Sequence, residues 1–165
     1  MTGTRRRSFE PGHRPKYLIV IDETEECGRA IYFAARRAAH IGAGVTMLTF
    51  LDEVEPGHWL GVGDIMKAEA EDAASARLSA AAARVRDIAG IEAELLVRSG
   101  PAADSIRTLI NEDQDISFLI LAASASSEGP GPLVSQLAGK SAGTFPVPVV
   151  IVPGDMTDEA IDAVA

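Results

Sequence analysis

The chain has 165 residues, of which 47% are hydrophobic and 24% charged, and this suits one globular domain around a single core. The formal net charge is −9. Five of the 15 basic residues lie in the first 16 positions, where Glu10 is the single acidic residue. The rest of the chain therefore carries 10 basic and 23 acidic residues, and this negative charge makes it a poor ligand for nucleic acid.

The two ends of the chain differ in composition from its middle. Residues 1–15 are rich in arginine, glycine and proline, which predicts a disordered basic tail that could also touch an acidic partner. Residues 16–153 are expected to form the folded domain, and 154–165 a C-terminal tail or short helix. No apolar run reaches transmembrane length, and the N-terminus lacks the hydrophobic segment of a secretory signal. We therefore expect a cytoplasmic protein without a membrane partner.

The first predicted element is a buried parallel strand at 16–22, KYLIVID. Thr24 is a candidate N-cap for the helix that follows, and Gly42 and Gly44 end that helix before a second strand at 44–51. A long helix runs from about 64 to 89 and ends at Gly90, and a third strand covers 91–98. The side chains expected to face the core from these elements are those of Cys27, Ala30, Ile31, Ala34, Ala38, Ile41, Ala74, Leu78, Ala81, Val85, Ile88, Ala93, Leu95 and Val97.

The second half of the chain continues the alternation. A shorter helix begins at Pro101, a fourth strand covers 116–122, a short helix starts at about 133, and a fifth strand covers 147–152. This order predicts an α/β fold of one domain, a three-layer sandwich with a five-stranded parallel sheet covered by helices on both faces. Such folds bind ligands beyond the carboxyl ends of the strands, so the loops after Asp22, Leu51, Arg98 and Ala122 are the candidates for a site.

Three phosphate sites known from folds of this class do not fit these loops. Gly139-Lys140-Ser141 ends like a Walker loop, but Val134 stands where that loop needs its first glycine, and the preceding residues read as a helix. A flavodoxin-like site would put a phosphate on the loop DETEE, whose carboxylates would repel it. A response-regulator receiver needs an acceptor aspartate at the end of the third strand, which instead ends in Arg98-Ser99-Gly100.

The sequence shows no sign of metal or catalytic chemistry. His13, His40 and His58 are far apart and lack the spacing of a metal site. Cys27 is the only cysteine, which excludes an intrachain disulfide, and we expect it to be a small apolar residue of the first helix. No nucleophile–base pair can be recognised, so we expect a protein that is not an enzyme.

Three blocks between Lys16 and Pro153 together resemble the universal stress protein (UspA) family. They are KYLIVIDETEECGRAIYFAARRAAHIGAGVTMLTFLDE, ISFLILAAS and VPVVIVP. The resemblance implies a Rossmann-like fold of the adenine nucleotide α-hydrolase-like type and a non-catalytic, homodimeric module that acts in a stress response. Some members bind ATP beside strands one and four, through the backbone amides of a Gly-x-x-Gly-nine-Gly-Ser/Thr pattern, whereas others lack the pattern and hold nucleotide poorly.

This chain departs from the nucleotide-binding pattern. Aligned without gaps, its four positions hold Ala122, Ala125, Ser135 and Gln136. With a shift of four residues they hold Ser126, Gly129, Gly139 and Lys140, which is still one glycine short. By the resemblance, an adenine-nucleotide cleft would involve Asp22, Phe50, Ala122, Ser124, Ser126, Gly129, Gly131, Gly139 and Lys140. Asp22 would accept hydrogen bonds from a ribose, or it simply caps the next helix.

The loop after the fourth strand also loses donors to proline. Pro130 and Pro132 have no N–H and a fixed φ, whereas a phosphate nest needs successive amides that point inward. Glu128 adds a repelling charge. We therefore predict a degenerate phosphate loop, with ATP or another adenine nucleotide left open as a ligand and no certain cofactor or metal.

The resemblance further implies a homodimer that pairs through the fifth strand, whose predicted interface residues are Val147, Val149, Val150, Ile151 and Val152. The leading interpretation is the non-catalytic stress-response module. One alternative is an adenine-nucleotide-binding switch of the same fold, and another is a protein-interaction module independent of nucleotide. Trp59 either covers the cleft, meets a partner or has a plain packing role.

Overall fold

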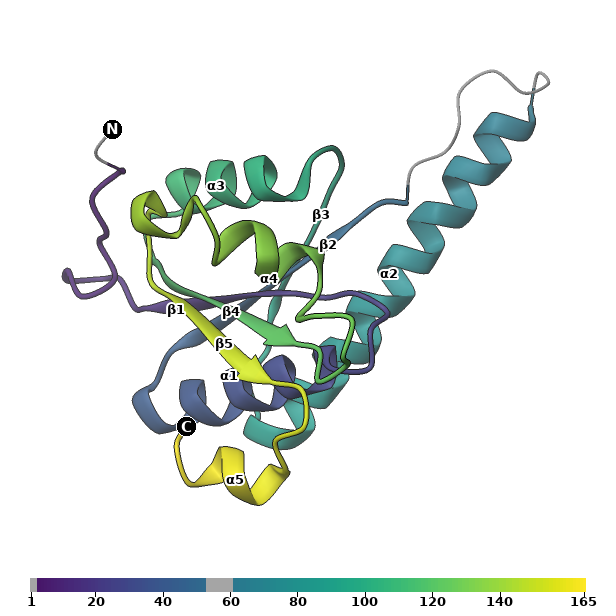
Figure 1. The fold of residues 1–165 in the computed structure, drawn as a ribbon. Coiled ribbons are helices and arrows are strands. Elements are labelled where there is room, and N and C mark those ends of the chain that lie inside the picture. Colours follow the sequence, from purple (N-terminus) through teal and green to yellow (C-terminus); the bar gives the residue numbers. More distant parts are fainter. Residues whose placement is uncertain (1–2, 53–60) are drawn as a thin grey trace.

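The computed structural model describes residues 3–52 and 61–165 (Figure 1). The strands are β1 (Lys16–Val20), β2 (Gly44–Phe50), β3 (Glu94–Arg98), β4 (Ile116–Ala123) and β5 (Val149–Pro153). The helices are α1 (Cys27–Ile41), α2 (Val62–Ala89), α3 (Ala102–Glu112), α4 (Pro132–Leu137), the short 3-10 helix η1 (Ala142–Thr144) and α5 (Asp158–Asp162). The predictions for His58 and Trp59 lie outside the described residues.

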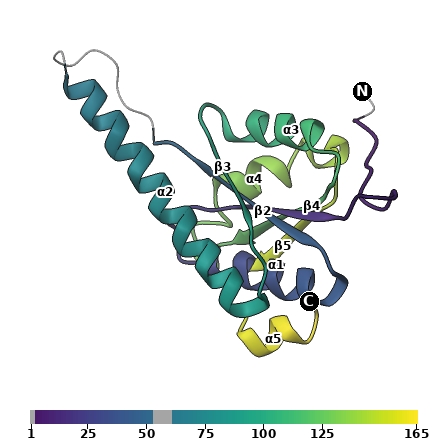
Figure 2. The same cartoon turned by 180° about the vertical axis from the view of Figure 1, so that it is seen from behind.

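The strands form one parallel sheet in the order β3-β2-β1-β4-β5, which confirms the predicted fold class. Side chains of a strand point alternately to its two faces. From β1, Tyr17 and Ile19 pack on the side of α1 and α2, and Leu18 and Val20 pack on the side of α3 and α4. Figure 2 shows these two helical layers with the sheet between them. β1 is the central strand, and its carboxyl end lies between those of β2 and β4.

Glycines end the first two helices as expected. Gly42 and Gly90 both adopt the left-handed conformation, with φ of 73° and 67°, which a residue without Cβ adopts at little cost. Their amides donate to the carbonyl oxygens of Ala38 and Arg86. Each helix therefore stops where the chain must turn back towards the sheet.

The predicted core faces of α1 and α2 are confirmed except at their margins. Ile41 is 41% exposed at the end of α1. The prediction is wrong for β3, where Leu95 and Val97 are 42% and 39% exposed. The reason is that β3 is an edge strand, and the amino-terminal part of α2 projects past the sheet (Figure 1). The amino-terminal part of α2 is exposed as well, with Val62, Ile65 and Met66 open to solvent.

The N-terminal segment differs from the disordered tail that its composition predicts, because residues 3–15 pack on the domain in the structure. Arg6 Nη1 donates to the carbonyl oxygens of Ile110, Asp113 and Ile116, at 2.6, 3.0 and 3.3 Å. Ser8 is only 3% exposed and donates to the Asp115 carbonyl oxygen. The pKa of the Arg6 guanidinium is lowered overall, because the effect of burial is larger than the opposing effect of the nearby Asp113 and Asp115 carboxylates.

The C-terminal residues fold back on α1 through the short helix α5. The Thr157 hydroxyl accepts from the Ala160 amide and caps α5, and Ile161 is fully buried. Arg29 on α1 forms an ion pair with Asp158 at 2.7 Å.

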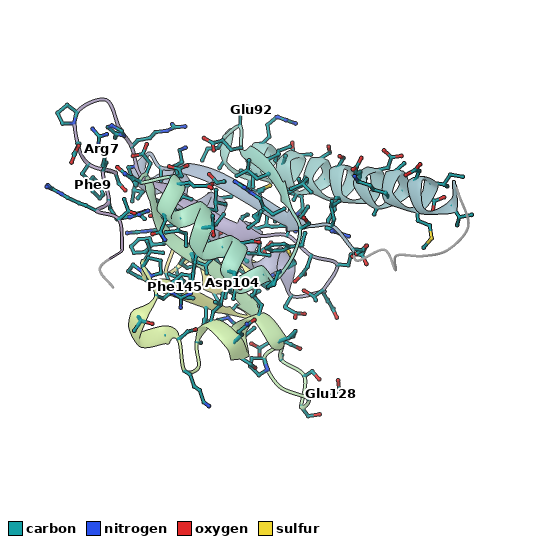
Figure 3. The ribbon with its side chains drawn as sticks, turned by 90° about the horizontal axis from the view of Figure 1, so that it is seen from above. Arg7, Phe9, Glu92, Asp104, Glu128 and Phe145 are labelled. Carbon is teal, nitrogen blue, oxygen red and sulfur yellow. The ribbon has the colours of Figure 1, made fainter. Side chains whose placement is uncertain are left out.

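Within the N-terminal segment, the turn around Phe9 stands away from the body, and the Phe9 side chain is 86% exposed (Figure 3).

The Arg6 contacts predict that Arg6→Ala destabilises the protein more than Arg5→Ala. Arg6 holds three carbonyl oxygens at the end of α3, so its loss should lower the free energy of unfolding by about 1–2 kcal/mol. The Arg5 side chain is 90% exposed, so its removal should change that free energy by less than about 0.5 kcal/mol. Urea denaturation of both variants measures the difference, and equal effects would show that the segment does not contribute through Arg6.

Candidate functional site

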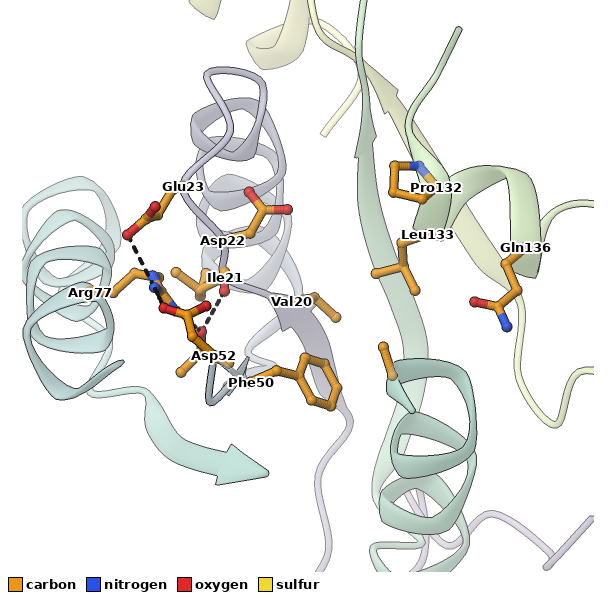
Figure 4. Close-up of a pocket in the computed structure, with 12 residues that line it drawn as sticks. Val20, Ile21, Asp22, Glu23, Phe50, Asp52, Arg77, Pro132, Leu133 and Gln136 are labelled. Atoms are coloured by element: carbon orange, nitrogen blue, oxygen red, sulfur yellow. Dashed lines mark hydrogen bonds and ion pairs between the residues drawn. The ribbon is translucent and has the colours of Figure 1, made fainter. Parts of the chain in front are cut away.

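A cleft opens at the carboxyl ends of β1 and β2 and extends to α4 (Figure 4). Its volume is ≈ 340 Å³ and its lining is mostly apolar. The residues that line it are Val20, Ile21, Asp22, Glu23, Thr49, Phe50, Asp52, Arg77, Ala102, Pro132, Leu133 and Gln136. The cleft therefore lies where parallel α/β sheets bind ligands.

Asp22 follows β1 and shapes the first wall of the cleft. Its Oδ1 accepts from the Thr24 amide at 2.9 Å and from the Thr24 hydroxyl. This is a local turn of the loop rather than a cap of α1, since the N-cap residue Glu26 makes no side-chain capping bond. Oδ2 is the second acceptor of the carboxylate and can serve a ligand.

The other residues expected around a nucleotide fall into three places. Phe50 lines the cleft itself. Ala122 lines an adjoining hollow of ≈ 110 Å³ beneath Asp22. Ser124, Ser126, Gly129 and Gly131 line an open hollow of ≈ 570 Å³ on the outer side of the loop. Gly139 and Lys140 follow the end of α4 and line neither the cleft nor these two hollows.

The loop after β4 uses its own amides. The Ser124 amide donates to the Pro130 carbonyl oxygen at 3.0 Å, and the Gly129 amide donates to the Ser126 carbonyl oxygen at 3.2 Å. The Ser126 and Glu128 amides donate to the hydroxyls of Ser124 and Ser126, at 3.1 and 3.2 Å. These four amides are bonded inside the loop, so they are not available to a phosphate nest, which needs successive amides that point at the ligand.

Two prolines and two carboxylates also disfavour the binding of phosphate beside the loop after β4. Pro130 and Pro132 have no N–H, and between them Gly131 adopts a φ of 104° that a side chain would make strained. Glu26 and Glu128 both line the outer hollow. Figure 3 shows Glu128 at the outer end of the loop. The hollow beside the loop therefore offers carboxylates where a nucleotide would need amides.

Arg77 is a cleft residue that the sequence analysis missed. It projects from α2, its side chain is only 13% exposed, and its Nη1 donates to the Thr49 hydroxyl at 2.9 Å. Its Nη2 donates to Glu23 at 3.2 Å and lies 3.9 Å from an Asp52 oxygen. The available signal was a charged residue between Ala74 and Leu78, on the face of α2 that is otherwise buried.

Cys27 lies at the start of α1, beside the hollow that Ala122 also lines. It is 6% exposed, and its Sγ donates to the Val20 carbonyl oxygen at 3.6 Å. Burial raises the pKa of the thiol to about 11. Cys27 is therefore a packing residue in its protonated form, as predicted, rather than a thiolate nucleophile.

The predicted interface residues differ in burial, and Val147 lies before the start of β5. Val147 and Val152 are 5% and 2% exposed, so they pack inside the domain. Ile151 is 39% exposed, while Val149 and Val150 are half-buried. β5 is hydrogen-bonded to β4 on one side only and forms the edge of the sheet.

Two general features complete the description of the site. Among residues 3–52 and 61–165, no three His, Cys, Asp or Glu side chains are grouped closely enough to hold a metal ion. No helix in the described part of the chain is long and apolar enough to cross a membrane.

Comparison with known proteins identifies relatives. The model of the universal stress protein family matches residues 14–153. A solved universal stress protein, UspA from Lactobacillus plantarum, has a TM-score of 0.63 and 17% identity and covers 84% of this chain and 97% of its own. A sequence search of curated proteins finds no match.

Two further similar structures carry nucleotides. A universal stress protein from Archaeoglobus fulgidus in complex with dAMP has a TM-score of 0.53 and 22% identity, over 84% of this chain and 97% of its own. A universal stress protein family protein from Arabidopsis thaliana with AMP bound has a TM-score of 0.61 and 14% identity, over 88% and 94%. At these identities the likeness shows the fold.

The raised pKa of Cys27 predicts slow alkylation of the folded protein. With a pKa of about 11 in place of 9.0, the thiolate fraction at a pH of about 8 falls roughly a hundredfold, and so should the rate of reaction with iodoacetamide. Folding favours the protonated thiol, so this contribution to stability is complete below pH 9.0 and is lost as the pH rises towards about 11. Equal alkylation rates in buffer and in concentrated urea would contradict this assignment.

Proposed function

The chain belongs to the universal stress protein family, and we propose that it is a non-catalytic binding module whose cleft accepts a nucleoside but does not grip a triphosphate. Members of this family act in stress responses and are generally non-catalytic. The observation that carries the proposal is the internal hydrogen bonding of the loop after β4, which engages the amides of Ser124, Ser126, Glu128 and Gly129.

The nucleoside part of the proposal is supported by the lining of the cleft. Val20, Phe50 and Leu133 give apolar surface for a purine, and Asp22 and Gln136 place polar groups among them. The volume of ≈ 340 Å³ lies at the small end of ligand pockets, which run from roughly 300 Å³ upwards. Similar family structures hold AMP and dAMP, which are adenine nucleosides with one phosphate.

The absence of catalysis follows from the same loop. Transfer of a phosphoryl group depends almost entirely on positioning and on electrostatic stabilisation of the phosphates. Here Glu26 and Glu128 line the hollow beside the loop, and four of the loop amides are already bonded within the loop. A triphosphate therefore gains no fixed position from which it could react.

Calorimetric titration tests this function. We expect adenosine to bind, and ATP with Mg²⁺ to bind no more than about threefold tighter than AMP, because the added phosphates meet no donors. Asp22→Asn retains an Oδ1 for Thr24 but replaces the second acceptor oxygen by an NH2 donor, and should weaken adenosine binding about tenfold. The matched control is Asp87→Asn on the exposed side of α2, which should leave binding unchanged.

The two alternatives give different results in the same titration. A nucleotide-binding switch would bind ATP with Mg²⁺ tenfold or more tighter than AMP, and this would overturn the proposal. A module that works independently of nucleotide would bind neither adenosine nor AMP nor ATP. In that case the cleft would have no ligand of this class.

The assembly proposed for this module is a homodimer through β5, since members of the family are commonly dimeric. β5 leaves one edge unpaired and exposes Ile151. Pro148 does not obstruct this edge, because its carbonyl oxygen accepts from the Leu119 amide at 3.1 Å and its backbone therefore faces β4. A second β5 would satisfy the open donors and acceptors.

Light scattering after gel filtration measures this assembly. Ile151→Lys places a charge in the proposed interface and should convert a dimer to a monomer. Ile41→Lys is the matched control, because Ile41 is exposed to a similar degree, 41% against 39%, but lies on α1. A monomeric unsubstituted protein, or a dimer that survives Ile151→Lys, would contradict the β5 interface.

A further inference from the structure

Arg77 is held in the cleft by groups that are themselves buried. The Thr49 side chain is fully buried, and its hydroxyl donates to the Ile21 carbonyl oxygen at 2.7 Å while accepting from Arg77 Nη1 at 2.9 Å. The guanidinium is thereby tied to the ends of both β1 and β2. Its Nε is buried without a partner among the described residues, so the fixed position has a cost that packing must offset.

The carboxylates on Arg77 are far less constrained than Arg77 itself. Glu23 is 80% exposed and Asp52 is 75% exposed, whereas Arg77 is 13% exposed. Ion pairs with exposed partners contribute little to stability, because water competes for the carboxylate and the side chain loses entropy. Glu23 can therefore leave Arg77 at little cost, and the guanidinium would remain in place.

The charges around the cleft are arranged unequally. On the side of the β4 loop, Glu26 and Glu128 line the open hollow, where the loop amides are already bonded within the loop. On the side of α2, Arg77 is the one cation among the residues that line the described cleft, and the carboxylates of Glu23 and Asp52 lie beside it. A ligand with a single anionic group thus meets carboxylates at the loop end. At the α2 end it meets a fixed guanidinium beside Asp52, which becomes accessible when Glu23 moves away (Figure 4).

We infer that Arg77 receives the phosphate of a nucleoside monophosphate, and that Glu23 occupies this position in the empty protein as an internal substitute for the ligand. The inference rests on the proposed nucleoside binding. The phosphate displaces the Glu23 carboxylate from Nη2, and the base lies towards Pro132 and Leu133. The ligand is therefore turned so that its phosphate points to α2 and away from the loop after β4.

Titration with AMP and with adenosine separates this inference from the proposed function. Phosphate bonded by a fixed guanidinium should make AMP bind about tenfold tighter than adenosine to the unsubstituted protein. Glu23→Gln removes the competing carboxylate and should raise the ratio of AMP affinity to adenosine affinity about three- to fivefold. Arg77→Gln should bring this ratio close to one.

The matched control is Glu25→Gln, which removes the same charge from the same exposed loop at a residue that does not line the cleft. It should leave the affinity for AMP within about twofold, since long-range charge effects are screened by salt. If Arg77→Gln does not fold, Glu23→Gln still decides the matter, because Glu23 is a surface residue.

Two results would overturn the inference. One is equal binding of AMP and adenosine, and the other is a Glu23→Gln variant that binds AMP no better than Glu25→Gln does. Both leave the nucleoside function standing, since adenosine still binds. Failure of adenosine and AMP alike to bind would refute the proposed function, and the inference with it.

Discussion

Hydrogen bonds inside the loop after β4 determine what the cleft can hold. In a phosphate nest, successive amides point at the ligand, and here the amides of Ser124, Ser126, Glu128 and Gly129 point at the loop. Pro130 and Pro132 make this arrangement stiff, because each fixes its own φ. A change of ligand could not recruit these donors without breaking the loop first.

The sheet places a second charged centre opposite this loop. Because β1 lies between β2 and β4, its carboxyl end separates the loop of prolines and carboxylates from the guanidinium of Arg77. On our proposal, an anionic group binds at Arg77 and not at the loop after β4, so the side of α2 sets the direction in which this cleft would hold a charged ligand.

The sequence predicts most of the fold because local signals agree with one another. Apolar runs, amphipathic helices and the stopping glycines Gly42 and Gly90 recur in the structure. What it could not predict depends on distant contacts. Arg6 bonds to carbonyl oxygens more than a hundred residues away, and the exposure of Leu95 follows from the position of β3 at the sheet edge. The effect of the loop prolines could be predicted from the sequence. The hydrogen bonds from loop amides to serine hydroxyls and the position of Arg77 in the cleft could not, because both depend on how the chain folds.

Amide chemical shifts recorded during titration with ATP and Mg²⁺ test the central claim most directly. The account predicts that the amides of Ser124, Ser126, Glu128 and Gly129 keep their shifts at saturation, while signals around Asp22 and Thr49 move as the cleft fills. Large shifts of those four loop amides, with the rest of the protein unchanged, would show that the loop opens and holds the phosphates after all.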